Sequence, residues 1–153
     1  MGEIARLLPA SNIVVDLDIA TKPQFFEAMG QLLERNAGLA RGGVAASLAA
    51  RERLGSTGLG QGVAIPHGRI KGLAAAVGAF ARLPAPIPFD APDGKPVGQL
   101  FVLLVPEQAT DQHLQLLSEL AQMFSDRAFR DGLATAADTA AIRALFENWE
   151  PAA

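Results

Sequence analysis

Apolar residues recur along parts of the chain with the 3.6-residue period of an amphipathic helix. One such stripe, between Thr21 and Gly38, consists of Phe25, Phe26, Met29, Leu32 and Leu33. Thr21 is predicted to cap the start of this helix, with Pro23 near its first turn, and Gly38 is predicted to end it. We expect the stripe to belong to the hydrophobic core.

Four further helices are predicted after residue 40, at about 44–54, 110–125, 126–133 and 138–146. The first follows the pair Gly42-Gly43. Thr110 or Asp111, then Asp126, and finally Asp138 or Thr139 are the expected N-caps of the other three. In the helix at 110–125, the expected apolar stripe consists of Leu114, Leu117, Ala121 and Phe124, with Leu120 alongside.

Strand patterns alternate irregularly with these helices. Ile13–Leu17 is short and β-branched, and Ala74–Leu83 precedes three prolines that favour an edge or an irregular extension. Leu100–Val105 is the most apolar run of the chain, so we expect a central strand that is buried on both faces. The alternation predicts an α/β fold, and by its length the chain of 153 residues is expected to form one domain.

One stretch, residues 56–69, joins closely spaced glycines to a histidine that a proline precedes. A short apolar run, Val63–Ile65, leads to Pro66 and His67. Because proline locks φ and extends the residue before it, His67 is expected at the end of a short strand, rigidly presented. With a pKa of about 6.5, a neutral imidazole offers a nitrogen lone pair for phosphoryl transfer. The bland alternative is a structural or solvated histidine, which is the commoner case.

Composition narrows the chemistry that this histidine can perform. The chain has no cysteine, which excludes disulfides and thiol chemistry, and it has only two histidines. Even with Glu52 or Asp111, these supply no clear set of zinc ligands, so neither a metal nor a cofactor is expected. The net charge of −3 argues against nucleic acid as a partner. Without a signal pattern or a long apolar run, we expect a cytoplasmic protein with no membrane insertion.

Three short motifs, Arg51-Glu52, Ser56-Thr57-Gly58 and the run Gly62–Gly68, surround the histidine. Together they resemble the phosphorylation-site signature of enzyme IIA domains of the bacterial phosphoenolpyruvate phosphotransferase system, in its fructose–mannitol type. The stand-alone nitrogen-regulatory branch is the most similar, and the resemblance extends over about residues 4–147. It implies a mixed sheet of about five strands with helices on both faces, whose strand directions the hydrophobic pattern does not supply. It also implies that residues 1–153 form a single enzyme IIA-like phosphocarrier domain.

The resemblance further implies a site assembled from distant parts of the chain. His67 matches the phosphorylated residue, and Arg51 matches an arginine that donates paired hydrogen bonds to phosphoryl oxygens. His113 matches a second histidine, and in the first turn of its helix it would stay neutral and donate its N–H to the phosphoryl group. Thr57 and Gly58 match positions that bind the phosphoryl group or hold the loop.

Some of these residues also have a purely structural interpretation. Arg51 would stabilise the C-terminal end of its helix through the helix dipole. His113 would be an ordinary surface residue of its helix. Arg69 is the most ambiguous, because it would contact the phosphoryl group, meet an acidic partner, or pair with a nearby carboxylate.

The function implied is that of a phosphotransferase component with a phosphohistidine intermediate. The expected phosphoryl donor is a histidine phosphocarrier protein. Two roles are compatible: a regulator whose phosphorylation state selects partners such as a transporter or sensor kinase, and a sugar-specific enzyme IIA that feeds a permease B domain. The lack of a fused permease or carrier segment favours the regulator. A third possibility is a binding module in which His67 is inert. The sequence leaves open the partner, the oligomeric state and the phosphorylated imidazole nitrogen.

Overall fold

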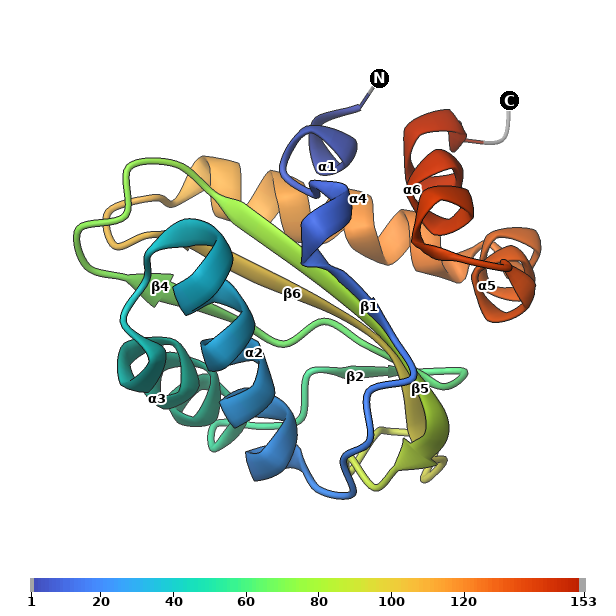
Figure 1. Cartoon of the computed structure of the whole chain (residues 1–153), viewed down its shortest axis with the longest axis horizontal. Helices are drawn as coiled ribbons and strands as arrows, with labels where there is room; N and C mark the ends of the chain where they lie inside the picture. Colours follow the sequence, from blue (N-terminus) through green and yellow to red (C-terminus); the bar gives the residue numbers. More distant parts are fainter. Residues whose placement is uncertain (1, 152–153) are drawn as a thin grey trace.

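The computed structural model of the protein describes residues 2–151, which are arranged around a mixed sheet (Figure 1). The strands of this sheet are β1 (Ile13–Val15), β2 (Gly58–Gly60), β3 (Val63–Ala64), β4 (His67–Ile70), β5 (Val77–Ile87) and β6 (Val97–Pro106). Their order is β1-β5-β6-β3-β2, and β4 also pairs with β6. The predicted α/β class with a mixed sheet is confirmed, with six strands in the described part where about five were expected.

Strand β6 is the centre of the sheet. It runs antiparallel to β5 on one side and parallel to both β3 and β4 on the other. Leu100–Val105 is fully buried, which confirms the central strand expected from its apolar run. On the β3–β4 side the ladder is interrupted at Ile65 and Pro66, since proline has no N–H to donate. His67 therefore begins β4, so the prediction that it ends a strand is wrong.

Helices cover both faces of the sheet, as the resemblance implied (Figure 1). One face packs against α2 (Lys22–Ala37) and α3 (Arg41–Glu52). The other face packs against four helices and a 3₁₀ turn, η1 (Ala10–Asn12). These helices are α1 (Glu3–Arg6), α4 (Asp111–Ser125), α5 (Arg127–Thr135) and α6 (Thr139–Asn148). Two apolar clusters, one on each face, form the core.

Most of the predicted helix ends are confirmed, because capping depends on neighbouring residues. The Thr21 side chain accepts a hydrogen bond from the N–H of Gln24, and Gly38 ends α2 in the left-handed conformation at φ 68°. Asp126 and Asp138 cap α5 and α6 in the same way as Thr21 caps α2. Thr110 precedes α4 without a capping hydrogen bond from its side chain.

The structure differs from the prediction most clearly in the face that α4 turns inward. Leu114 is 66% exposed, whereas His113 and Leu116 are buried together with the expected Leu120 and Phe124. A spacing of three and four residues fits a buried face that begins at Leu114 and equally one that begins at His113. The structure has the face that begins at His113. In addition, α3 begins at Arg41, before the two glycines that were expected to precede it.

Candidate functional site

His67 stands at the start of β4, opposite Leu103 of β6, and its side chain is partly buried. Its Nδ1 lies 2.8 Å from the carbonyl oxygen of Ile65. In the neutral ring, Nδ1 donates its hydrogen to this carbonyl, so the free lone pair resides on Nε2. The backbone of the Ile65-Pro66 segment thus orients the ring and selects the nitrogen available for reaction.

Helix α3 packs closely against β4, because Gly68 has no side chain. A Cβ at Gly68 would lie only 2.2 Å from the Oγ of Ser47. That Oγ donates a hydrogen bond of 2.9 Å to the carbonyl oxygen of Arg69, which joins α3 to β4. Arg51 is one helical turn beyond Ser47 and therefore lies on the same face of α3. The close packing of glycine against serine brings the end of α3 to His67.

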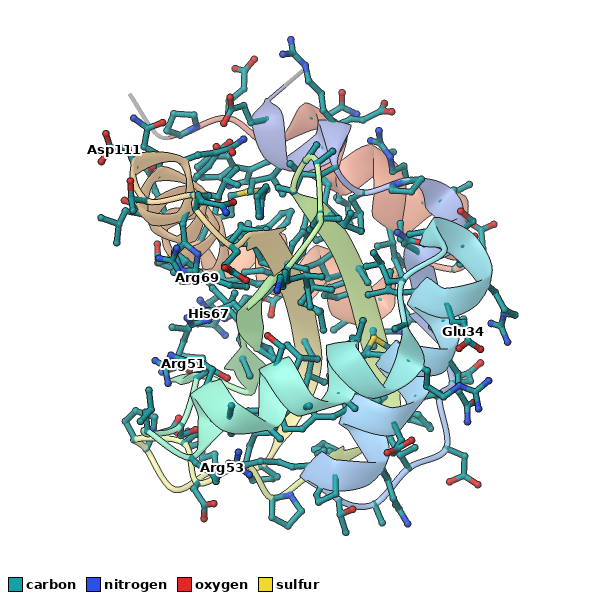
Figure 2. The ribbon with its side chains drawn as sticks, turned by 90° about the vertical axis from the view of Figure 1, so that its left-hand side faces the viewer. Glu34, Arg51, Arg53, His67, Arg69 and Asp111 are labelled. Atoms are coloured by element: carbon teal, nitrogen blue, oxygen red, sulfur yellow. The ribbon has the colours of Figure 1, made fainter. Side chains whose placement is uncertain are left out.

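The guanidinium of Arg51 is held near the site by the loop that follows its helix. Its Nη1 donates a hydrogen bond of 2.9 Å to the carbonyl oxygen of Gly55. Figure 2 shows Arg51, His67 and Arg69 along the same side of the molecule, while Arg53 lies farther off at the end of α3. Arg51 is thus a cation beside His67 that is available for an anionic group.

Glu52 anchors the loop at residues 53–58. Its side chain is 6% exposed, and its carboxylate lies 3.1 Å from the Nζ of Lys22. It accepts hydrogen bonds from the N–H of Thr57 at 3.0 Å and from the Thr57 hydroxyl at 2.7 Å. Since a threonine hydroxyl has one hydrogen to donate, Thr57 here holds the loop. Its predicted contact with a phosphoryl group stays a prediction.

Gly58 is required where the loop crosses the segment that follows β5. A Cβ there would lie 2.8 Å from the Cβ of Ala91, and the Gly58 N–H already donates to the Oγ of Ser56 at 3.0 Å. Gly58 therefore permits close packing of the chain beside the site. Its predicted role in phosphoryl binding is not tested by these contacts.

His113 is the third residue of α4 and is 9% exposed. Its ring lies edge-to-face against His67, with 5.3 Å between the ring centroids. Among residues 2–151, no hydrogen-bond partner is found for its buried Nδ1. Buried polar atoms usually have a partner, so His113 brings an unused hydrogen-bonding group close to His67.

Both imidazole rings are kept neutral by their surroundings. Burial lowers the pKa of His67 below its ordinary value of 6.5, and the charge of Arg51 lowers it further. The hydrogen bond to Ile65 and the charge of Glu52 act in the opposite direction. The pKa of His113 is lowered first by burial, then by the charge that His67 carries when it is protonated, and then by the charges of Arg69 and Arg51. His67 therefore retains its nucleophilic lone pair at neutral pH.

Arg69 bonds backbone carbonyls rather than a carboxylate. Its Nη1 donates to the carbonyl oxygen of Glu107, at 2.9 Å, and to that of Ala109.

The structure thus gathers Arg51, His67, Arg69 and His113 at one edge, with Thr57 and Gly58 in the neighbouring loop. Sequence reasoning missed the anchoring pair of Lys22 and Glu52. The only sign of this pair in the sequence was the glutamate of the Arg51-Glu52 motif.

The family model described as "Phosphoenolpyruvate-dependent sugar phosphotransferase system, EIIA 2" matches residues 6–149. The chain belongs to this EIIA 2 family. Membership assigns it to the phosphotransferase system, which confirms the resemblance seen in the motifs around His67. No helix in residues 2–151 of this EIIA 2 chain is long and apolar enough to cross a membrane.

Relatives of this EIIA 2 chain include nitrogen regulatory proteins. It is 51% identical over 96 residues to that of Pseudomonas aeruginosa, a match that spans 63% of this chain but only 62% of the relative. It is 36% identical over 139 residues to that of Bradyrhizobium diazoefficiens, covering 91% of each chain. The crystal structure of nitrogen regulatory protein IIA-Ntr from Neisseria meningitidis is 51% identical, with a TM-score of 0.89 and coverage of 94% and 99%. The expected similarity to the nitrogen-regulatory branch is thereby confirmed.

Proposed function

We propose that this protein accepts a phosphoryl group on Nε2 of His67 from a histidine phosphocarrier protein and regulates partner proteins according to its phosphorylation state. The observation that carries the proposal is the pair of His67 and His113, whose ring centroids lie 5.3 Å apart. One ring is oriented by Ile65 and partly exposed, and the other is buried with an unpartnered nitrogen. A purely structural histidine pair has no need of such an arrangement.

The transfer is an in-line displacement between two imidazoles. The Nε2 lone pair of His67 forms a new P–N bond while the P–N bond of the donor phosphohistidine breaks. The bonding electron pair returns to the donor nitrogen, so no proton has to move during the exchange. The Nδ1–H of His67 remains hydrogen-bonded to the carbonyl oxygen of Ile65, and this hydrogen bond stabilises the positive charge that the ring acquires.

Arg51 and His113 supply stabilisation of charge around the transferred group. A guanidinium donates strong hydrogen bonds to phosphoryl oxygens, and Arg51 reaches the site from the end of α3. A neutral His113 donates an N–H from the first turn of α4 without adding a second fixed cation beside the nucleophile. Positioned donors of this kind are the main source of catalysis in phosphoryl transfer.

Apolar side chains around the site support a protein as the partner. Among the described residues, the large exposed apolar side chains are Leu54, Leu59 and Leu114, with exposures of 84%, 45% and 66%. Each lies within three positions of a site residue in the sequence. Exposed leucines beside a reactive group are typical of a docking surface. We propose that residues 1–153 form a single domain and that this domain meets its partner in the cytoplasm.

Phosphorylation gives this face the properties of a switch. A phosphoryl group brings a charge of roughly −2 to a surface that includes exposed leucines. A partner that covers the unmodified face has to desolvate that charge, which opposes binding unless the partner supplies cations. The names of the relatives favour regulation, and a transporter or a sensor kinase is the expected kind of partner.

The decisive test is phosphorylation by phosphoenolpyruvate and the two upstream phosphotransferase components. Mass spectrometry should find one added phosphoryl group that is labile in acid and stable in alkali, as a phosphoramidate is. The H67A variant should accept none and keep its fold, whereas the control variant H113A should still accept the group slowly. An acid-stable phosphate on Ser56 or Thr57 would contradict the proposal.

A sugar-specific enzyme IIA is the second candidate, favoured by membership in a family of the sugar phosphotransferase system. The two roles differ in what receives the phosphoryl group. Unmodified protein and protein phosphorylated on His67 are each presented to a cytoplasmic and membrane extract. Partners that distinguish the two forms and are not sugar permeases support regulation. Rapid transfer through a permease B domain to sugar would overturn it.

A further inference from the structure

Arg69 connects the reactive strand to the loop that leads into α4. It lies two residues after His67 and opposite Val105 in the ladder between β4 and β6. Its Nη1 donates to the carbonyl oxygens of Glu107 and Ala109, 38 and 40 residues away in the sequence. One guanidinium therefore joins the strand of the nucleophile to the start of the helix that bears His113.

Within residues 2–151, Ala109 before α4 and Leu116 in it pack against an apolar cluster of the core, and the other hydrogen bonds at the start of the helix are local. Thr110 makes no capping hydrogen bond with its side chain. The backbone bonds there are local, from the N–H of Ala109 to the carbonyl of Pro106 at 3.0 Å and from the N–H of Leu114 to that of Thr110 at 3.2 Å. In Figure 2, Arg69 lies between His67 and the start of α4, which Asp111 marks. The contacts of Arg69 are thus side-chain hydrogen bonds that extend the attachment of this loop to β4 beyond the backbone pairing, which ends at Ile70 and Pro106.

We infer that Arg69 is a positioning residue: by binding the carbonyls of Glu107 and Ala109, it sets the place of His113 relative to His67. The inference rests on the proposed function, because that function gives His113 its part in phosphoryl transfer. It differs from the alternative in which Arg69 touches the phosphoryl group or an acidic partner directly. Nη1 is directed at the two carbonyls, and the direct alternative would have to use the Nε and Nη2 donors of the same guanidinium.

The two alternatives predict different outcomes for combined substitutions. R69M keeps the apolar stem of the side chain and removes its donors. Transfer to R69M from the phosphorylated carrier should be about 10-fold slower than to the unmodified sequence, and H113A should be slower by at least as much. The double variant should be no slower than H113A alone, because Arg69 acts through His113. If the two factors multiply instead, Arg69 acts independently and the inference fails.

Lys71 provides the matched control for charge. It is exposed and lies just beyond the end of β4, so K71M removes the same charge without touching the two carbonyls. Transfer to K71M should stay within about twofold of the unmodified sequence. Equal slowing in K71M and R69M would show that only the positive charge matters, which overturns the positioning role.

A second measurement requires no phosphoryl transfer. In NMR spectra of the unphosphorylated protein, through-space signals between the rings of His67 and His113 should weaken in R69M and persist in K71M. An unchanged ring contact in R69M would overturn the inference, even if the protein proved to accept no phosphoryl group. Thermal unfolding checks that the variants fold. If R69M proves too unstable to measure, R69Q replaces it. R69Q keeps a shorter side chain that can donate to one of the carbonyls, so its ring signal should be weaker than that of the unmodified sequence but still present.

Discussion

The two ends of α4 are built on different kinds of contact. Its C-terminal half packs into a cluster of rings with centroid separations of 5.2 to 6.3 Å, formed by Phe80, Phe101, Phe124, Phe129 and Phe146. Its first turn carries His113, which faces His67 and follows a loop that two hydrogen bonds from Arg69 join to β4. Apolar packing is non-directional and shared among many atoms, whereas one hydrogen bond fixes one orientation. The cluster should therefore determine stability and the polar end should determine transfer.

The largest expected effect is on the aromatic cluster. Phe146 packs against the other four rings, so F146A should lower the free energy of unfolding by about 3–5 kcal/mol. Urea unfolding measures this loss, and L114A, at an exposed position of α4, serves as the control. The transfer rate per folded molecule should remain unchanged in F146A. A large drop in that rate would break the distinction between the two ends.

The site that the polar end of α4 faces should respond in the opposite way to the loss of Arg51, which reaches it from α3. R51A removes a charged donor from the site, so transfer should slow by about 10- to 150-fold, equivalent to roughly 1.5–3 kcal/mol. Its free energy of unfolding should change by less than about 0.5 kcal/mol, because the side chain is not part of the core. Rapid-quench kinetics gives the rate, with R53A as the control. Equal slowing in R53A would point to general electrostatics instead.

Gly68 lies where close packing and the polar site meet, so a substitution there tests both kinds of contact. In G68A the new methyl group collides with the Ser47 hydroxyl and lies 3.2 Å from the Ser47 Cβ, so the hydroxyl must leave the Arg69 carbonyl and α3 must shift slightly away from β4. Such overpacking costs about 1–3 kcal/mol of stability, and transfer should also slow because Arg51 is displaced. G42A is the matched control, since nothing lies within 4 Å of a Cβ placed there. Adding S47A should recover part of both losses, and no recovery would locate the strain elsewhere.

The smallest effect expected is a dependence of stability on pH. Both site histidines have a pKa below 6.5 when folded, so the folded state binds fewer protons than the unfolded chain in this range. Stability should therefore fall as the pH drops from 6.5 to the lowered pKa values and then level off for these two groups. Urea unfolding from about pH 8 to about pH 5 measures this. The same pH dependence in a variant with glutamine at both positions would contradict it.

Much of the fold is visible in the sequence because it depends on neighbouring residues. The cap and stripe of α2, the apolar run of β6 and the caps of α5 and α6 all act over a few positions. Likewise, Pro66 restrains the backbone directly before His67. The motifs around the histidine were sufficient to recognise the EIIA 2 family, and with it the mixed sheet that periodicity alone does not supply.

The arrangement of the site was decided only by the tertiary structure. Periodicity allowed α4 two registers one residue apart, and packing against the sheet chose the one that buries His113 and exposes Leu114. The salt bridge between Lys22 and Glu52 joins residues 30 positions apart. Arg69 finds carbonyl partners that only the pairing of β4 with β6 brings near. Local patterns report the conformation of a segment, while the orientation of a side chain at a site depends on which distant segment packs against it.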